Sequence, residues 1–426
     1  MKARPTALIA ALLGCGVVSV PAFAQSPEFK FSGFGTIGAA HSNEQNADYV
    51  GSIFQPTGAG HTKSWSFGPD SKLGAQVNAT FGDKLSAVVQ VVAQHQYDNS
   101  WKPQLEWANV KYQVSSDVSV RLGRIALPQY LISESRFVGY ANPWVHVPHE
   151  VYGVLSITSN DGVDVTWRTR FGNANNTLQA YYGTSTAKLS TGKVKSKPGW
   201  GINDSIEIGS LTLRAGYSHL DLDIELSSLG PLFAGLSQFA AGVGTVPAPA
   251  YQTAAAQAIA LQNKYKLNDM KLSAVAVGAS FDPGEWFLMS EFVAFKGDGF
   301  LSDSRSWYVS GGYRFGSFTP YLTYSSTKAR IENEAGISTT GLDPTSAAGA
   351  AGLTAGINAT LYQFTGTQNS VSAGLRWDVM KNVALKAQID RLHVGERSNG
   401  RLANVQPNFQ AGGHINVVSL AADFVF

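Results

Sequence analysis

Arginine recurs at alternate positions in two segments that flank a long irregular stretch. Arg121 lies in VSVRLGRI, and Arg168 and Arg170 lie in DVTWRTRF. Both segments alternate polar with apolar residues, which predicts β-strands that carry the arginines on their polar faces. Arginines on neighbouring strands stand about 4.8 Å apart and repel one another unless water or facing acids surround them. The chemistry of such a row is electrostatic, because it can orient charged or dipolar solutes.

The stretch between the two segments covers residues 126–160. It is about 35 residues long, and a loop of that length is either functional or disordered. Its many apolar and aromatic residues argue against disorder. It also holds the acids Glu134 and Glu150. We therefore expect the loop to fold against the arginine-bearing strands and to turn Glu134 and Glu150 towards them.

Patterns for catalysis and metal binding are weak by comparison. His146 and His149, next to Glu150, could suggest a metal site, but Pro148 interrupts any helix that would align them. A complete set of ligands is not evident. No Ser-His-Asp or nucleophile-elbow pattern stands out. We expect no enzyme activity, no cofactor and no metal site.

The N-terminal segment has the pattern of an export signal. A basic start, an apolar run over Ala7–Val20 and the motif Ala22-Phe23-Ala24 predict a cleaved signal peptide of residues 1–24. The alternative is a lipoprotein, because Leu-Leu-Gly-Cys resembles a lipidation box ending at Cys15. With cleavage after Ala24 the mature chain contains no cysteine, and a disulfide framework or a thiol nucleophile is excluded.

Composition narrows the class of protein. Removing residues 1–24 takes away Lys2 and Arg4, so the formal net charge falls from +2 to 0, which argues against nucleic acid as a partner. Beyond the signal, no segment reaches the roughly 18–20 apolar residues of a membrane-spanning helix. Only 15% of residues are charged and 44 are glycine. These values suit a soluble all-β protein or a transmembrane β-barrel.

About sixteen alternating segments follow one another in a single domain, residues 25–426. Their connections alternate between turns of about two to four residues and much longer loops, which is typical of an antiparallel barrel with short periplasmic turns and long outer loops. The predicted strands are Lys30–Ala39, Ser71–Phe81, Leu85–Gln96, Gln104–Val114, Val118–Ile125, Asp164–Phe171, Thr177–Gly183, Gly201–Ile208, Leu211–Leu220, Met270–Phe281, Glu285–Phe295, Ser306–Phe315, Phe318–Ser326, Ser370–Met380, Val383–Leu392 and Ile415–Phe426.

The alternation of polar and apolar residues does not by itself show which face of each strand contacts water, because the strands of a soluble β-sandwich alternate in the same way. The export signal, the asymmetry of the loops and the aromatics near many strand ends favour a membrane barrel with a polar lumen. The lumen would then hold two groups of cations. Lys111, Arg121, Arg168, Arg170 and Arg214 would line the narrow section opposite Glu134 and Glu150, and Arg314, Arg376 and Lys386 would lie elsewhere on the wall.

Two long connections have patterns of their own. Tyr251–Leu267 is rich in alanine and lacks glycine and proline, which predicts a short helix in an outer loop. Gly336–Thr367 is rich in Gly, Ala and Thr, and we expect it to be mobile.

The chain resembles the trimeric Gram-negative porins of about sixteen strands. The resemblance rests on the terminal strand LAADFVF, the third outer loop and the alternation of turns. Pro143–Tyr152 is similar to that loop in one proteobacterial branch, whereas the Gly- and Asp-rich acidic motif of enteric porins is absent. The resemblance implies that residues 126–160 form the constriction loop and that Phe426 is the assembly signal. It also implies a homotrimer in the lipid of the Gram-negative outer membrane.

These observations predict a water-filled channel for passive diffusion of small hydrophilic solutes and ions. Basic residues outnumber acids among the assigned lumen positions, so we expect a weak preference for anions. Two alternatives stay open. One is a channel of the same fold that selects carboxylates or aromatic acids. The other is a barrel whose long loops serve as a binding or adhesion surface.

Overall fold

Sixteen long antiparallel strands form a closed barrel in the computed structural model, which describes residues 26–154, 156–330 and 333–426. Three short strands, β4 (Trp65–Ser66), β11 (Thr186–Leu189) and β12 (Gly192–Ser196), join the same sheet, and β2 (Asp48–Tyr49) pairs with β3 (Ala59–Gly60). The barrel strands are β1 (Glu28–Ser42), β5 (Lys72–Phe81), β6 (Leu85–Gln94), β7 (Gln104–Gln113), β8 (Val118–Ala126), β9 (Ser159–Phe171), β10 (Ala174–Thr184), β13 (Gly199–Ile208), β14 (Leu211–Leu226), β15 (Met270–Phe281), β16 (Trp286–Gly297), β17 (Ser304–Tyr313), β18 (Phe318–Ala329), β19 (Gln368–Met380), β20 (Val383–Val394) and β21 (His414–Val425). The predicted all-β barrel is confirmed.

The barrel closes where the first strand meets the last. One half of β1 pairs with β5 and the other half with β21, so β1 joins the two ends of the sheet and closes the barrel. The closure continues to the last residue: the amide of Phe426 donates to the carbonyl of Gly33 at 3.0 Å, and the amide of Gly33 donates back at 2.9 Å. Gly33 is needed there, because a Cβ would collide with the ring of Phe426. The seam therefore depends on the extreme C-terminus.

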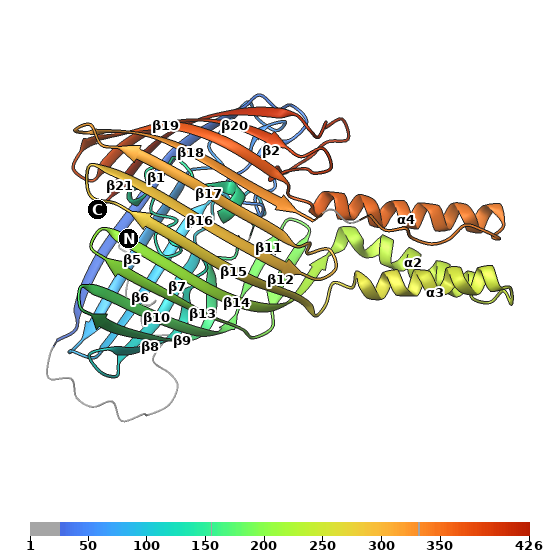
Figure 1. Ribbon diagram of the computed structural model, residues 1–426, viewed down its shortest axis with the longest axis horizontal. Coiled ribbons are helices and arrows are strands. Elements are labelled where there is room, and N and C mark those ends of the chain that lie inside the picture. The colour runs from blue at the N-terminus through green and yellow to red at the C-terminus, as the bar shows by residue number, and fades with distance from the viewer. Residues whose placement is uncertain (1–25, 155, 331–332) are drawn as a thin grey trace, which may run out of the picture.

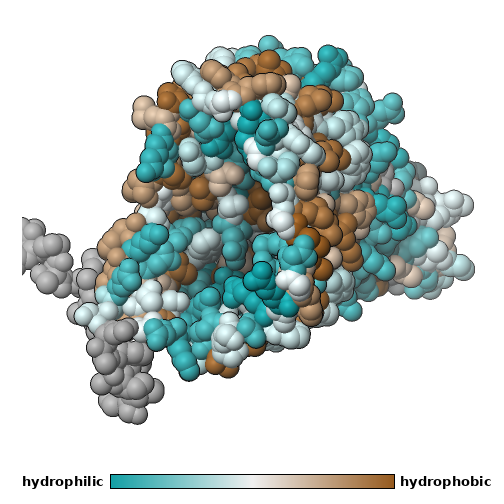
Figure 2. Space-filling model, turned by 60° about the vertical axis from the view of Figure 1, so that its left-hand side comes forward, coloured by the Kyte–Doolittle hydropathy of each residue, from teal (hydrophilic) through white to brown (hydrophobic). Residues whose placement is uncertain are grey.

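Alternation sorts the side chains between lumen and lipid as expected. On β9, Asp164 and Thr166 are 1% and 6% exposed, whereas Val165 and Trp167 are 43% and 49% exposed. Viewed obliquely from the end that carries the short turns, hydrophilic surface gathers around a hollow and hydrophobic surface lies on the flanks (Figure 2). The hydrophobic effect thus drives the outer wall into lipid, and the polar faces surround the lumen.

All the short turns lie at one end of the barrel, and the long connections lie at the other (Figure 1). Residues with positive φ make the tight reversals; examples are Gly172 between β9 and β10 (φ 61°) and Asn382 between β19 and β20 (φ 66°). Three helices project from the long-loop end: α2 (Gly230–Val243), α3 (Pro249–Lys264) and α4 (Pro344–Phe364).

The helix expected over Tyr251–Leu267 is confirmed as α3. Part of Gly336–Thr367, the segment that we expect to be mobile, forms the regular helix α4 (Pro344–Phe364). Its small residues allow close packing: a Cβ on Gly356 would meet Leu232 of α2 at 2.9 Å. The predicted signal peptide, residues 1–24, lies outside the described residues, and so does Cys15.

No helix in the described ranges is both long and apolar enough to cross a bilayer.

Asp343 is the N-cap of α4, and its side chain accepts hydrogen bonds from the amides of Thr345 (2.9 Å) and Ser346 (3.2 Å). Its other oxygen accepts from the hydroxyl of Tyr251 on α3 at 3.0 Å. We expect Asp343→Ala to leave the first-turn amides without an acceptor and to speed their hydrogen exchange, measured by mass spectrometry. Asp343→Asn, which can still cap, should keep most of the protection. Equal exchange in the alanine variant and the native chain would contradict this role.

Candidate functional site: a lumen narrowed by an inward loop

Residues 127–158, between β8 and β9, fold into the barrel; we call them the inward loop. The two ends of the loop are joined where it leaves the sheet, because the amide of Leu127 donates a hydrogen bond to the carbonyl of Thr158 at 2.8 Å. Two short turns shape it, η2 (Gly139–Ala141) and α1 (His149–Tyr152). The segment matches the loop expected over residues 126–160 to within two residues at each end.

Aromatic side chains fix the loop against the far wall. Trp144 is 1% exposed, and its indole Nε1 donates to Ser310 Oγ (2.8 Å) and Thr323 Oγ1 (3.0 Å). Glu291 of β16 holds two points of the loop at once. One carboxylate oxygen accepts from the amide of Leu131 at 2.6 Å, and the other accepts from the hydroxyl of Tyr152. The apolar composition of the loop thus reflects packing against the wall.

Three of the predicted wall cations hold the backbone of the inward loop. Arg214 Nη2 donates to the carbonyl of Pro128 at 2.9 Å, and Arg376 Nη1 donates to that of Tyr140 at 2.6 Å. Each of these residues points inward, as the alternation predicted. The structure places both side chains under the loop, where they neutralise carbonyl dipoles rather than face open water.

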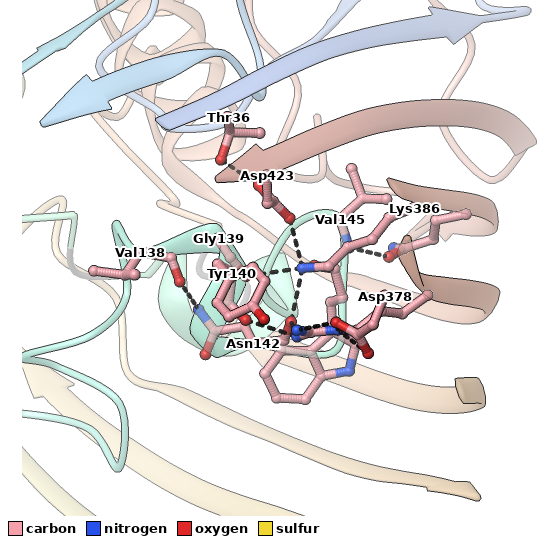
Figure 3. Close-up of polar contacts among 12 residues, drawn as sticks. Thr36, Val138, Gly139, Tyr140, Asn142, Val145, Asp378, Lys386 and Asp423 are labelled. Carbon is pink, nitrogen blue, oxygen red and sulfur yellow. Dashed lines mark hydrogen bonds and ion pairs between the residues drawn. The ribbon is translucent and has the colours of Figure 1, made fainter. Parts of the chain in front are cut away.

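Lys386 forms the densest of these contacts (Figure 3). Its ammonium donates to the carbonyls of Gly139 (2.8 Å), Asn142 (2.7 Å) and Trp144 (2.9 Å). It also pairs with the carboxylate of Asp423 on β21 at 2.7 Å, and both side chains are fully buried. Asp423 in turn accepts from Thr36 of β1 at 2.5 Å. One buried lysine therefore connects the inward loop to the seam of the barrel.

Glu150 does not face the arginines, contrary to expectation. It lies in α1, and the turn directs its side chain at β18 and β19. There the carboxylate is 1% exposed and accepts from Ser325 Oγ (2.6 Å) and Gln368 Nε2 (2.8 Å). The assignment of Glu150 to the open lumen is therefore corrected: it is a docking residue of the loop.

Glu134 does lie close to Arg121, with its carboxylate 3.4 Å from Nη1. The stronger partner of Arg121 is Asp164 on β9, whose carboxylate accepts from Nε at 2.9 Å and from Nη2 at 2.6 Å. The sequence analysis did not identify Asp164 as a partner of Arg121, although the alternation in DVTWRTRF puts Asp164 on the same polar face as Arg168. Lys111 stands opposite Arg121 in the strand register. These residues form a basic column that is partly neutralised by acids.

Arg168 and Arg170 extend this inward face towards the short turns and are exposed. Arg314 follows β17 at the same end, where it pairs with Asp282 at 2.7 Å. It therefore lies at the rim of the barrel rather than in its narrow section.

A second basic region lies on the long-loop side of the inward loop, around a cavity of about 390 Å³. Its cations are Lys72 of β5, Arg124 of β8, Arg136 of the inward loop and Lys188 of β11. Arg124 pairs with Asp161 at 2.6 Å. Lys72 and Arg136 form no ion pair within the described ranges, and they are close enough to repel one another.

Arg136 is positioned by the inward loop itself. Its Nη2 donates to the carbonyl of Tyr152 at 3.1 Å, and its guanidinium lies 5.7 Å from the ring centroid of the same tyrosine. The sequence analysis assigned neither Arg136 nor Lys72 to the lumen. The signal for Lys72 was present, because Lys72, Gln76 and Asn78 share the polar face of their strand.

No group of three or more His, Cys, Asp and Glu side chains suited to a metal occurs among the described residues. The imidazole of His146 bridges two acids, with Nδ1 3.3 Å from Asp70 and Nε2 3.2 Å from Asp390. His149 Nε2 lies 3.1 Å from the carbonyl of Gly51. Both histidines therefore tie the inward loop to its surroundings.

A sixteen-stranded barrel narrowed by an inward third loop is one of two observations that bear on identity. The other is a family model described as Gram-negative porin, which matches residues 6–396. The chain belongs to the Gram-negative porin family. This porin is accordingly a diffusion channel of the outer membrane.

Solved structures share the fold of this porin at low sequence identity. The anion-selective porin from Comamonas acidovorans has a TM-score of 0.52 at 13% identity, covering 94% of this chain and 100% of that one. OmpF of Salmonella typhi, in complex with daunomycin, has a TM-score of 0.54 at 10% identity and covers 93% and 97%. The trimer form of in-vitro folded OmpT, an outer membrane protein of Vibrio cholerae, has a TM-score of 0.52 at 11% identity and covers 94% and 100%. No curated protein matches the chain.

Proposed function

We propose that this porin passes small hydrophilic solutes passively, without catalysis, and that it prefers anions. The observation that carries the preference is an excess of cations around the cavity above the inward loop, where Lys72, Arg124, Arg136 and Lys188 outnumber the carboxylates of Asp70 and Glu106. Of these cations, Lys72 and Arg136 form no ion pair in the described residues. An anion that passes between them gains attraction from both, and a cation is repelled by both. Arg121 contributes less, because Asp164 and Glu134 already neutralise it.

Similar solved structures and the C-terminal strand support a trimeric assembly in the outer membrane. One solved structure of the same fold is named an anion-selective porin, and another is a trimer form. We propose a homotrimer in outer-membrane lipid, export through a cleaved signal peptide of residues 1–24, and an assembly role for Phe426. The position of Phe426 at the β1–β21 seam is consistent with that role, because the strand that ends there closes the barrel.

The test of ion preference is the reversal potential of the purified porin in a planar bilayer under a potassium chloride gradient. We expect the native protein to pass chloride more readily than potassium. In the double variant Lys72→Met/Arg136→Gln, the reversal potential should shift towards that of a cation-preferring pore, because the substitutions remove two positive charges from the lumen. Lys381→Met removes an exposed lysine from a short turn and should change little. Cation preference in the native protein, or an unchanged potential in the double variant, would refute the proposal.

One feature favours a substrate-selective channel as the second candidate. The cavity places the aromatic rings of Phe54, Phe137 and Tyr97 beside cations, and Lys188 lies 5.6 Å from the ring centroid of Tyr97. An aromatic carboxylate would find both an apolar and a charged partner there. Benzoate at low concentration should then reduce the chloride current. A general porin would keep its current under the same conditions. A binding role for the outer loops remains a third hypothesis, and α2, α3 and α4 would be its elements.

A further inference from the structure

Four cations point away from the lumen at the long-loop ends of four successive strands. Lys271, Lys296, Arg305 and Lys328 belong to β15, β16, β17 and β18, and all four are exposed. Their neighbours along the strands show which way they face. On β17, Ser304 and Ser306 are buried on the lumen side, so Arg305 between them projects from the outer wall. We call these four residues the outer basic cluster.

The strand register brings the cluster together. Arg305 stands directly opposite Lys328, and it also stands opposite Ala294, two residues from Lys296 on the same face. Like charges directly opposite one another destabilise a sheet. None of the four forms an ion pair in the described chain. The arrangement is costly unless an anion from outside the chain lies between the side chains.

Two acids lie near the cluster. Asp221 stands opposite Lys271 in the register and partly neutralises that end of the cluster, because its other neighbour, His219 at 3.4 Å, is an ion-pair partner only when its ring is protonated. Asp303 precedes Arg305 by two residues and pairs with Arg330 at 3.9 Å. Elsewhere on this rim lysines are neutralised, for example Lys193 by Glu225 at 2.8 Å. The outer basic cluster is therefore an open concentration of positive charge on the lipid side of the wall.

An apolar surface begins directly below the cluster. The ring centroids of Trp307 and Tyr324 lie 5.2 Å apart, and both side chains are 39% exposed on the outer wall. Trp286 lies on the same face at the other end of β16, about ten residues from Lys296. At about 3.3 Å per residue and a tilt near 40°, that separation spans about 25 Å, the height of the apolar band of a membrane barrel. The cations consequently stand at the level of the lipid headgroups beside the long loops.

We propose that the outer basic cluster binds the phosphate groups of an anionic lipid of the outer leaflet. The guanidinium of Arg305 can donate two parallel hydrogen bonds to a phosphate, and the three lysines supply compact charges around it. The acyl chains lie on the apolar wall below.

The apolar wall decides between a lipid and a free anion as the occupant. A free phosphate would use only the four cations, whereas a phosphorylated lipid uses both the cations and the rings of Trp307 and Tyr324. The proposal commits to the lipid, and it concerns the outer wall, so it does not depend on the ion preference of the lumen.

Native mass spectrometry of the detergent-purified porin tests the proposal with bisphosphorylated lipid A as the probe. We expect the native protein to retain lipid A, and Arg305→Gln/Lys328→Gln to retain at least about fivefold less, because the central pair of charges is lost. Lys193→Gln/Lys197→Gln removes two rim lysines that already have acidic partners and should retain lipid A as the native protein does. Both double variants should unfold at the native temperature, because every changed side chain is on the surface.

Four outcomes would overturn the proposal. The first is equal retention of lipid A by the native protein and Arg305→Gln/Lys328→Gln. The second is equal retention of phosphatidylcholine and lipid A by the native protein, which would show that phosphate charge is not recognised. The third is full displacement of lipid A by millimolar inorganic phosphate, which would indicate a free-anion site. The fourth is protection of Lys296 and Lys328 from amine-reactive labelling in lipid-free protein, which would indicate that a second copy covers this face.

Discussion

Replacing Lys386 by methionine is expected to release the inward loop from the wall and to lower the thermal stability of the barrel. The ammonium of Lys386 serves three loop carbonyls and the carboxylate of Asp423, all away from water. Removing one partner of a buried ion pair costs about 3–5 kcal/mol, because the other charge stays buried and unpaired. The temperature at which the folded band disappears on semi-native gels should fall. Single-channel conductance should become larger or less steady, because the loop no longer narrows the lumen at one position.

Two further variants distinguish the loss of the loop contacts from the loss of the ion pair between Lys386 and Asp423. Lys386→Met/Asp423→Asn removes both charges, so the unfolding temperature should recover in part. The conductance should still differ from that of the native porin, because the carbonyls of Gly139 and Trp144 still lack their donor. Arg314→Met removes a cation whose ion pair is half exposed at the rim, which is worth only about 0–1 kcal/mol. Native conductance and stability in Lys386→Met would show that the loop is held by other contacts alone.

The side of the wall on which each residue lies could be predicted from the sequence, because a strand alternates its side chains with a period of two. Arg214, Arg376 and Lys386 point inward as expected. What surrounds them could not be predicted, because the partner of Lys386 is a loop more than two hundred residues earlier in the chain. The period of two predicts on which face of the sheet a side chain lies, but not whether the inward loop covers it. A wall cation under the loop and a wall cation in open water therefore have the same sequence pattern.

The acids of the inward loop show the same limit. Glu134 and Glu150 both occur in an irregular segment, where no period relates one side chain to the next. A four-residue turn at His149–Tyr152 decides that Glu150 faces β18 and β19 rather than Arg121. The helix α4, unlike α3, was not predicted, and the reason is different. The glycines of Gly336–Thr367 weaken helix propensity, but packing between α4 and α2 uses their small size and outweighs that cost.

Acidification is expected to loosen the inward loop at its histidines. Burial lowers the pKa of His149 to about 4, and the nearby positive charge of His146 adds to the effect. Burial alone would also lower the pKa of His146, but the carboxylates of Asp390 and Asp70 outweigh it and raise that pKa to about 10. The two rings lie 5.8 Å apart, and His149 stacks on Tyr49 at 5.4 Å. Glu150, the next residue along the chain, is the remaining acid beside them.

The sign of the effect follows from linkage between protonation and docking. A released loop would expose His149 with its ordinary pKa near 6.5, so release takes up a proton between pH 6.5 and 4 and docking weakens as the pH falls. His146 acts in the opposite direction: its raised pKa supports docking below pH 6.5, and that support is lost as the pH rises towards 10. Docking is therefore strongest near neutral pH, and His149 sets its acid limit.

Single-channel recording across a pH series can assign that acid limit to one side chain. The native porin should develop current fluctuations below about pH 5, as His149 gains a proton beside the positive His146. His149→Gln can still donate a hydrogen bond to the carbonyl of Gly51 but cannot become charged, so its current should stay steady to a pH lower by about one unit. His219→Gln replaces a histidine on the outer face of β14 and should behave as the native protein does. Fluctuations that begin at the same pH in His149→Gln and in the native porin would contradict this role of His149. The acid limit would then belong to Asp70 and Asp390, because their protonation would weaken the bridge that His146 forms between them.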